Sequence, residues 1–292
     1  MSTPKLKLGI PKGSLQEATV KLFEKSGWRI KEHHRNYFPE IDDAEIACSM
    51  CRAQEMSRYV ESGLLDCGLT GKDWILENES DVVVVEDLIY SKVSSRPARW
   101  VLAVAGDSPY KRPEDLNGKR VATELMGYTK RYFEQAGVAV DVQFSWGATE
   151  AKVVEGLADA IVEVTETGAT IKAHGLRIIA EVLVTNTQFI ANKTAWADPW
   201  KRRKIENMIM MLKGALRAEK LVGLKMNVPG QAKAKVLSEL PSLTSPTVAN
   251  LLDSDWLSIE IVVSDATVRD LIPKLKEAGA EGIIEYSLNK VV

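Results

Sequence analysis

The sequence is poor in the features that mark several broad classes of protein. Three cysteines in 292 residues are too few for a disulfide framework, so a reducing cytosol is the expected compartment. No apolar run approaches the roughly 20 residues of a membrane helix, and Met1–Gly9 has no apolar signal-peptide core. A net charge of -2 gives no general attraction to nucleic acid or to a membrane surface. An anionic ligand must therefore be held by a local site.

The overall composition is that of an ordinary globular protein. Hydrophobic residues make up 45% and charged residues 27%, a mixture that can bury a core. With roughly 150 residues per domain as a guide, 292 residues predict two or three domains.

The first 190 residues alternate apolar runs with helical patterns, which predicts an α/β fold with parallel strands. A strand is expected at 5–10, followed by a helix that begins at Ser14 with Glu17 as its capping-box partner. Further strands are expected at 66–69, 82–90, 99–105, 120–123, 140–144 and 159–164, and further helices at 53–60, 127–136 and 149–157.

Two α/β lobes joined by crossing strands explain this order, as in the core of periplasmic binding proteins. We expect residues 1–93 and 184–220 to form lobe I and residues 94–183 to form lobe II. The segment 177–191 is read as one long β-rich return between them. Ligands of such proteins bind in the cleft between the lobes.

The last third of the chain has a different pattern. Asp198 and Pro199 open a long helix to about Lys220, and its basic run 201–204 is read as a solvated face. From Val222 the order becomes strand, helix, strand, strand, helix, strand. This βαββαβ order predicts a ferredoxin-like, ACT-like domain over 221–292.

The most informative stretch is the end of the strand 159–164 and the turn behind it. Thr167-Gly168-Ala169-Thr170 can cradle a phosphate, because small residues let backbone N–H groups approach it and hydroxyls add donors. Glu163 can accept hydrogen bonds from a ribose diol, whereas Glu166 should point outward because a carboxylate repels phosphate. The alternative is a simple strand-to-helix turn with threonine as the cap.

Several segments in order along the chain resemble the ATP phosphoribosyltransferase family, the first enzymes of histidine biosynthesis, in its long form. The turn above and the segment 155–163 before it resemble the family's phosphoribosyl-diphosphate loop. The other matching segments are 9–13, 52–60, 66–73, 118–124, 173–177, 240–248 and 279–283.

The resemblance implies transfer of a phosphoribosyl group from phosphoribosyl diphosphate to N1 of ATP, with loss of pyrophosphate. It implies that positioning and electrostatics drive the reaction, without a general base, and that Mg²⁺ is bound through the pyrophosphate. The ribose and 5-phosphate would be held by Glu163, Glu166, Thr167, Gly168, Ala169 and Thr170. Lys12 and Arg52 would face the anionic groups, and the remaining walls of the cleft would be Thr70, Gly71, Asp73 and Glu124.

Each of these assignments has a structural alternative. Lys12 is also compatible with a solvated turn, and Arg52 with an ion pair to a nearby acid. Asp73 is compatible with a cap before Trp74, and Glu124 with an exposed strand end. Ser14 departs from the family pattern, because many relatives carry arginine there.

For the C-terminal domain, the resemblance implies feedback inhibition by histidine. Asn227, Ser245 and Thr247 stand where contacts to the effector are expected, although all three are common turn residues. Members of the long form assemble as hexamers and dimers, so a homo-oligomer is expected.

The sequence also holds patterns that we do not assign to a metal. Cys48 and Cys51 have C-x-x-C spacing but no second pair, and Cys67 lies in a buried strand. His33, His34 and His174 have no ligand partner at useful spacing, so no zinc is expected. Two other functions fit the same lobes: a solute-binding protein without chemistry, and a silent effector-sensing regulator. The lack of a secretion signal and the C-terminal unit argue against the first.

Overall fold

The computed structural model describes residues 4–32, 36–90, 97–241, 245–252 and 254–292. The chain divides into two compact units, which are described separately. One holds the residues up to 24 together with 28–209, and the other holds 25–27 and 210–292. No helix in the described ranges is long and apolar enough to cross a membrane.

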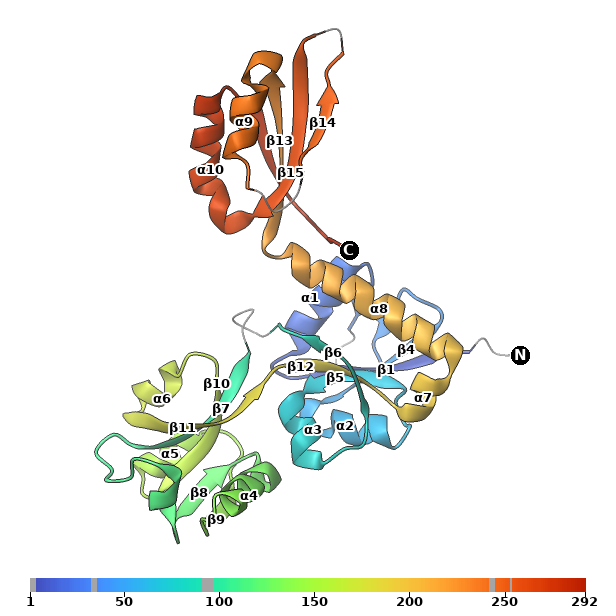
Figure 1. Ribbon diagram of the computed structural model, residues 1–292. Coiled ribbons are helices and arrows are strands. Elements are labelled where there is room, and N and C mark those ends of the chain that lie inside the picture. Colours follow the sequence, from blue (N-terminus) through green and yellow to red (C-terminus); the bar gives the residue numbers. More distant parts are fainter. Residues whose placement is uncertain (1–3, 33–35, 91–96, 242–244, 253) are drawn as a thin grey trace. The chain divides into compact units, whose positions relative to one another are not determined.

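The first unit contains a five-stranded sheet that we call lobe I, with the order β4-β1-β5-β12-β6. β1 runs parallel to β4 and β5, and β12 runs antiparallel to β5 and β6. The helices α2 and α3 lie on one face of this sheet, and α1 and α8 lie on the other (Figure 1). The strands are β1 (Leu6–Lys12), β4 (Ile46–Arg52), β5 (Cys67–Gly71), β6 (Val83–Leu88) and β12 (Thr187–Ala191), with a small ribbon of β2 (Ile30–Lys31) and β3 (Glu40–Ile41). The helices are α1 (Gln16–Ser26), α2 (Ala53–Glu61), α3 (Lys72–Asn78), α7 (Lys193–Ala197) and α8 (Pro199–Ala218).

A second five-stranded sheet in the same unit, lobe II, has the order β11-β7-β10-β8-β9. Alternate residues of β7 point to opposite faces, as the pleat requires. Trp100 and Leu102 pack in one core with Phe133 of α4, while Val101 and Ala103 pack in another with residues of α5 and α6. The strands are β7 (Ala98–Ala105), β8 (Arg120–Thr123), β9 (Asp141–Phe144), β10 (Ala160–Thr165) and β11 (Leu176–Thr185). The helices are a 3-10 turn (Pro113–Leu116), α4 (Met126–Gln135), α5 (Thr149–Val154) and α6 (Ala169–Ala173).

The chain passes between the two sheets twice. It leaves lobe I after β6 and enters lobe II at β7, and it returns through Asn186, the single residue between β11 and β12. The expected single return over 177–191 is therefore wrong, because two strands of different sheets occupy it. The predicted limits of the lobes remain predictions, and the limit at 93 and 94 lies outside the described residues.

The second unit is a four-stranded antiparallel sheet with the order β14-β15-β13-β16. This order and the succession of elements are those of a ferredoxin-like fold, so the predicted βαββαβ arrangement is confirmed. Ile259 and Val263 of β15 are buried in one core with Val236 of α9 and Leu275 of α10. The elements are β13 (Leu221–Pro229), a 3-10 turn (Gly230–Ala232), α9 (Lys233–Glu239), β14 (Thr247–Asn250), β15 (Trp256–Ser264), α10 (Asp265–Ala278) and β16 (Glu281–Ser287).

Some helix ends differ from those predicted. α1 begins at Gln16 instead of Ser14, and the N–H of Gly13 donates to Oε1 of Gln16 at 3.4 Å. α5 ends at Val154, three residues early, because Gly156 follows with a φ of 70°. The predicted cap of α8 is confirmed, since Oδ1 of Asp198 accepts from two backbone N–H groups at 2.9 Å.

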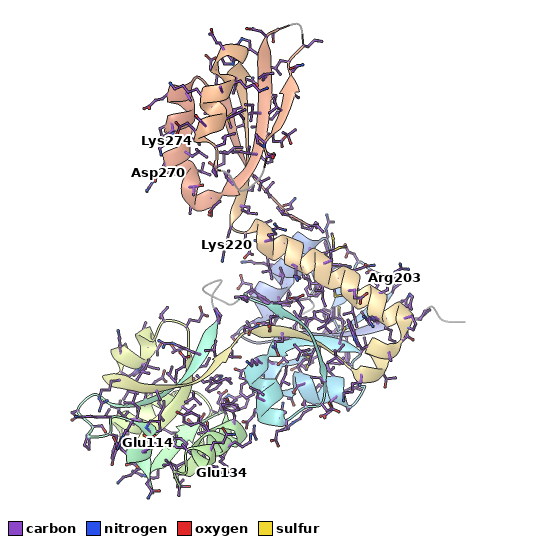
Figure 2. The ribbon with its side chains drawn as sticks, in the orientation of Figure 1. Glu114, Glu134, Arg203, Lys220, Asp270 and Lys274 are labelled. Carbon is purple, nitrogen blue, oxygen red and sulfur yellow. The ribbon has the colours of Figure 1, made fainter. Side chains whose placement is uncertain are left out.

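The basic run at the start of α8 is only partly a solvated face. Nζ of Lys201 lies 2.7 Å from the nearly buried Asp66 carboxylate, and Nζ of Lys204 lies 2.8 Å from Asp43. These two lysines therefore attach α8 to lobe I, which corrects the prediction. Arg203 is exposed and projects away from the helix (Figure 2).

Two glycines of the central strands make room for α2. Gly9 of β1 and Gly68 of β5 are register partners, and Met56 of α2 lies across both. A Cβ added at Gly68 would come within 2.6 Å of the Met56 sulfur. The helix can therefore pack closely on the sheet only because both positions lack a side chain.

We expect Gly68→Ala to destabilise the protein by about 1–3 kcal/mol, the usual cost of overpacking a core. In a Met56→Ala background the same substitution should cost much less, because the clashing sulfur is gone. Urea denaturation of the two single variants and the double variant measures this coupling. Additive effects in the double variant would contradict the packing argument.

Candidate active site

A cleft of about 500 Å³ in the first unit is lined by residues from both of its sheets. It lies at the carboxyl ends of β1, β4 and β5, where open α/β sheets bind ligands. Of the residues predicted for the site, it collects Lys12, Arg52, Gly71, Asp73, Glu124, Glu166, Thr167 and Thr170.

Lys12 and Arg52 are neighbours at the ends of two parallel strands. They are register partners in the β1–β4 ladder, and both line the cleft. Nζ of Lys12 lies 3.8 Å from the centroid of the Tyr37 ring, and the Arg52 guanidinium lies 5.9 Å from that of Trp146. Each cation is thus held over an aromatic face at the mouth of the cleft. Ser14 also lines it.

The turn after β10 is built from its own hydroxyl groups. Gly168 adopts a φ of 78° as the residue before α6, and its N–H donates to Oγ1 of Thr165 at 2.8 Å. The N–H of Ala169 donates to Oγ1 of Thr167 at 3.3 Å. These internal bonds fix the turn, with Thr165, Thr167 and Thr170 on the cleft side and Gly168 and Ala169 outside the lining.

Glu166 departs from its predicted orientation. It was expected to point outward because a carboxylate repels phosphate, but it lines the cleft and is half-buried. Repulsion from a phosphate does not by itself turn this carboxylate outward, because the cations of Lys12 and Arg52 line the same cleft.

Glu163 is a half-buried carboxyl group in the middle of β10, and it lies outside the cleft lining. Burial raises its pKa from 4.5 to about 7, although a hydrogen bond with the Thr149 side chain lowers it. The negative charges of Glu150 and Glu124 raise it further. Glu163 therefore titrates near neutrality, as many groups in functional sites do.

Glu124, after β8 of lobe II, reaches residues of lobe I. Burial raises its pKa, while a hydrogen bond with the Gln54 side chain, another with the backbone of Gly147 and the charge of Arg52 oppose this. The alternative of an exposed strand-end acid is wrong, because Glu124 is half-buried in the cleft wall.

Asp73 is buried where lobe I meets lobe II. Its Oδ2 accepts from Nε1 of Trp100 at 2.7 Å, and its Oδ1 accepts from the backbone of Trp74 at 3.0 Å. A Cβ at Gly71 would lie 2.0 Å from the same Oδ1, so only glycine fits there. Burial raises the pKa of Asp73 in spite of these bonds. The capping alternative is wrong, because Gly71 is the residue that precedes α3 and Asp73 lies within the helix. Its bond to Trp100 instead joins the two lobes.

Thr70 does not reach the cleft, contrary to expectation. It is fully buried, and its hydroxyl donates to the carbonyl oxygen of Ala53 at 2.7 Å. This bond ties the end of β5 to the first residue of α2. Thr70 therefore shapes the strand that carries Gly71 and Asp73.

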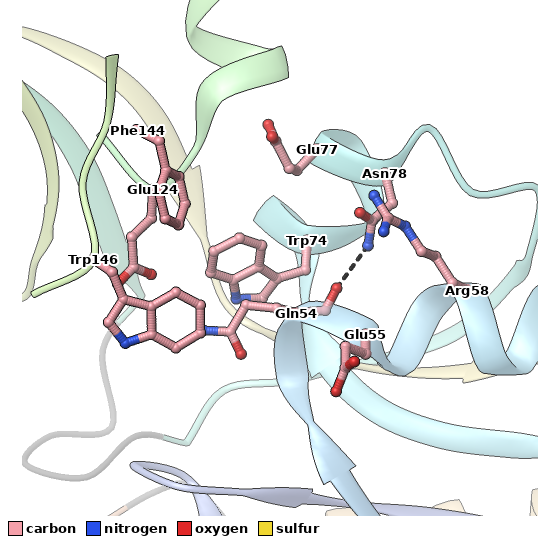
Figure 3. A pocket seen from close by; sticks show the side chains of 9 residues that line it. All are labelled: Gln54, Glu55, Arg58, Trp74, Glu77, Asn78, Glu124, Phe144 and Trp146. Carbon is pink, nitrogen blue, oxygen red and sulfur yellow. Dashed lines mark hydrogen bonds between the residues drawn. The ribbon is translucent and has the colours of Figure 1, made fainter. Parts of the chain in front are cut away.

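A smaller pocket of about 180 Å³ opens beside the cleft (Figure 3). Figure 3 shows the Trp74 and Trp146 rings beside the Gln54 side chain, with Glu124 between Phe144 and Trp146. Trp146 is 61% and Phe144 54% exposed, unusual values for such large aromatic residues. Gln54, Trp74 and Glu124 line both this pocket and the cleft, so the two hollows share a wall.

Several residues of the site gave no signal in the sequence. Trp100 reads as an ordinary apolar residue in a strand, and Gln54 as a polar residue on a helix. Their roles arise from the pairs that they form across the cleft, with Asp73 and with Glu124. Trp146 could have been singled out, because a tryptophan between Ser145 and Gly147 in a loop is unusual.

The residues with metal-binding chemistry do not assemble into a cage. In the described ranges, no group of three or more His, Cys, Asp or Glu could hold a metal ion. Cys48 and Cys51 sit on β4, and burial raises the pKa of each thiol to about 12. Their protonated thiols are structural.

The residues predicted to contact an effector lie on the second unit. Asn227 of β13 pairs with Ser258 of β15, and Thr247 of β14 pairs with Glu260, two positions along. Because residues two apart share a face of a strand, Asn227 and Thr247 belong to one face of the sheet. Ser245 is exposed just before β14.

Comparisons with known proteins give a consistent result. Residues 52–214 match the family model of ATP phosphoribosyltransferase, and residues 218–290 match that of the HisG C-terminal domain. The ATP phosphoribosyltransferase of Solidesulfovibrio magneticus is 77% identical over 98% of both chains, and one from Geobacter sulfurreducens is 57% identical over 98% of this chain and 99% of its own.

Among solved structures, an ATP phosphoribosyl transferase (HisG:HisZ) complex from Thermotoga maritima is similar to this chain. It covers 71% of this chain and 98% of that one at 30% identity, with a TM-score of 0.61. The chain therefore belongs to the ATP phosphoribosyltransferase family, in the form that carries a C-terminal regulatory domain, and acts in the first step of histidine biosynthesis.

Proposed function

We propose that the cleft of the first unit binds phosphoribosyl diphosphate and ATP side by side. In the reaction, the lone pair of adenine N1 forms a bond to the ribose C1, and the C1–oxygen bond to pyrophosphate breaks. The observation that carries this assignment is the meeting of a hydroxyl-rich turn, Thr165–Thr170, with the cation pair Lys12 and Arg52 in one cleft.

The turn suits the 5-phosphate. Thr167 and Thr170 line the cleft and can offer hydroxyl groups to a phosphate. The N–H groups of Gly168 and Ala169 are bonded to the hydroxyls of Thr165 and Thr167, and these internal bonds hold the turn in place before substrate arrives. A site organised in advance spends little binding energy on ordering itself. Glu163 lies on the adjoining strand β10, two residues before its end, and would accept hydrogen bonds from the ribose diol as a carboxylate.

Lys12 and Arg52 suit the polyphosphate groups. Charge builds on the departing pyrophosphate while the ribose becomes oxocarbenium-like, so fixed cations on one side and carboxylates on the other stabilise both. Mg²⁺ chelated by the diphosphate would neutralise part of the leaving group's charge. Mg²⁺ prefers substrate phosphates and takes few protein ligands.

We further propose that the chain works as a cytoplasmic homo-oligomer.

We also propose that histidine binds the second unit on the face of Asn227 and Thr247, with Ser245 nearby. The face is polar, and it carries Glu260, whose carboxylate accepts a hydrogen bond from Oη of Tyr286. Carboxylate, amide and hydroxyl groups together can recognise the amino, carboxyl and imidazole groups of an amino acid.

Purified protein given ATP, phosphoribosyl diphosphate and Mg²⁺ should release pyrophosphate only when both substrates are present, and millimolar histidine should lower the rate. Asn227→Ala should keep the rate and lose most of the inhibition. Lys274→Ala, an exposed position on α10 (Figure 2), is the matched control. Equal inhibition of Asn227→Ala and wild type would place the effector elsewhere.

Arg52→Gln should lower kcat/KM about 100-fold, the usual effect of removing one donor that stabilises developing charge. Lys12→Gln should have a similar effect. Lys5→Gln, which removes an exposed charge just before β1, should leave kcat/KM within twofold. Steady-state kinetics with each substrate varied in turn measures this, and equal losses at Lys5 and Arg52 would point to a general charge effect.

Glu163→Gln should make the protein more stable and less active. The raised pKa means that the folded protein holds this proton more tightly than the unfolded chain does. Its favourable contribution is complete below pH 4.5 and is lost as the pH rises through about 7. A neutral glutamine should therefore stabilise the fold at pH 8 by about 1–3 kcal/mol and have little effect at pH 4.5.

Urea denaturation at the two pH values measures the stability, with the exposed Glu155→Gln as the control. The kcat/KM of wild type should fall as the pH drops below about 7, when Glu163 gains its proton. The Glu163→Gln variant should be weakly active, and its kcat/KM should not show this fall at low pH. If kcat/KM of the variant falls with pH as it does in wild type, another group is responsible for the fall.

A further inference from the structure

Two helices, one from each lobe, meet beside the cleft, and each lacks the groups that would cap the end that faces the other. α4 of lobe II starts after Leu125, a residue with no polar side-chain atom to cap the helix. α3 of lobe I has no basic residue in its last turn and ends at Glu79 in the left-handed conformation, with a φ of 52°. A helix start without a capping acceptor, and an end without a donor, leave backbone groups unsatisfied.

Each helix receives the missing group from the other lobe. Oε1 of Glu77, on α3, accepts from the N–H of Gly127 at 2.9 Å, and Oε2 accepts from that of Tyr128 at 2.8 Å. The guanidinium of Arg131, on α4, donates to the carbonyl oxygen of Leu76 and lies 3.4 Å from the Glu79 carboxylate. A carboxylate thus meets the positive end of α4, and an arginine meets the negative end of α3.

Gly127 leaves room for the two side chains of this contact. A Cβ there would lie 3.2 Å from Nη1 of Arg131 and 3.3 Å from Oε2 of Glu77. Tyr128 adds its ring, whose centroid is 5.8 Å from the Arg131 guanidinium carbon. Residues of both helices therefore contribute to the fit of this contact.

The position of this contact links it to the reaction. Glu77 lines the small pocket beside the cleft (Figure 3), one wall of which comes from α2 and α3 and the other from Glu124, Phe144 and Trp146 of lobe II. A pocket with walls on two lobes exists only while the lobes keep this spacing. Hinged lobes of this kind open and close around ligands.

We propose that Glu77 and Arg131 form a reciprocal latch between the lobes, and that both are positioning residues for phosphoribosyl transfer. With the lobes together, each helix end is capped by the other lobe, and on opening both ends lose their caps at once. The latch thereby raises the fraction of molecules whose cleft is closed before substrate binds. The inference rests on the proposed use of the cleft, but the lobe spacing can be measured without turnover.

Loss of the latch should separate KM from kcat. When fewer molecules are closed, the apparent affinity falls in proportion, while saturating substrate still closes the cleft. Glu77→Ala should therefore raise the KM for ATP and phosphoribosyl diphosphate about 5- to 30-fold and leave kcat within twofold. Arg131→Met should act similarly, and the double variant should add little because the two residues act as a unit. Glu77→Gln should fall between wild type and Ala, because its amide oxygen still accepts one N–H.

Spin labels report the lobe spacing directly. Cysteines introduced at the exposed Glu24 of α1 and Glu155 of lobe II carry the labels, and the native thiols are replaced or shown to be unlabelled. Glu134→Ala, exposed on α4 (Figure 2), is the matched control. We expect a narrow distance distribution in wild type and the control, a broader and longer one in Glu77→Ala, and a return to the narrow one when both substrates are added.

The outcomes distinguish the latch from the proposed function. An unchanged distance distribution in Glu77→Ala, or a loss of kcat with KM unchanged, would overturn the latch. A wild type that shows the predicted distances but no turnover would keep the latch and refute the use of the cleft. If Glu77→Ala does not fold, Glu77→Gln and Arg131→Met provide the same two measurements.

Discussion

The active-site architecture depends on a buried carboxylate at the junction of the lobes. Asp73 follows the strand end of lobe I by two residues and accepts a hydrogen bond from the indole of Trp100, which stands on a strand of lobe II. A buried charge or a buried N–H group is costly unless it is hydrogen-bonded. The bond between the tryptophan of one lobe and the aspartate of the other removes this cost for both. The bare Gly71 follows from this pair, because any side chain there would strike the carboxylate.

The same constraint explains why the acids of the cleft have raised pKa values. Asp73, Glu124 and Glu163 come from different elements and converge on a partly dry space, where burial disfavours their charged forms. Buried ionisable groups of this kind weaken the fold, and they gather in functional sites, where their charge can act on a bound ligand. Lys12 and Arg52 bring positive charge to the same cleft, where the anionic groups of the substrates would lie.

How much of this could be predicted from the sequence depends on how local each feature is. The turn at Thr167–Thr170 and the βαββαβ order are written in adjacent residues, and both could be located by pattern alone. Lys12 and Arg52 could be paired only by way of the family resemblance, because their contact is a register of two strands 40 residues apart. The orientation of Glu166 was wrong because it was argued from one ligand group in isolation. Thr70 was misplaced because alternation along β5 does not reveal that its hydroxyl reaches Ala53.

The features that escaped prediction share one physical property: each is half of a pair. Leu125 before α4 looks like a poor cap, and Glu79 at the end of α3 looks like a strained residue, until Glu77 and Arg131 supply what is missing from the other lobe. The ends of a helix that carries its own caps are stabilised wherever the helix packs. The ends of a helix capped by a neighbour are stabilised only while that neighbour is in contact. Missing caps on two helix ends that face each other are therefore informative. Together they mark an interface at which each helix caps the other.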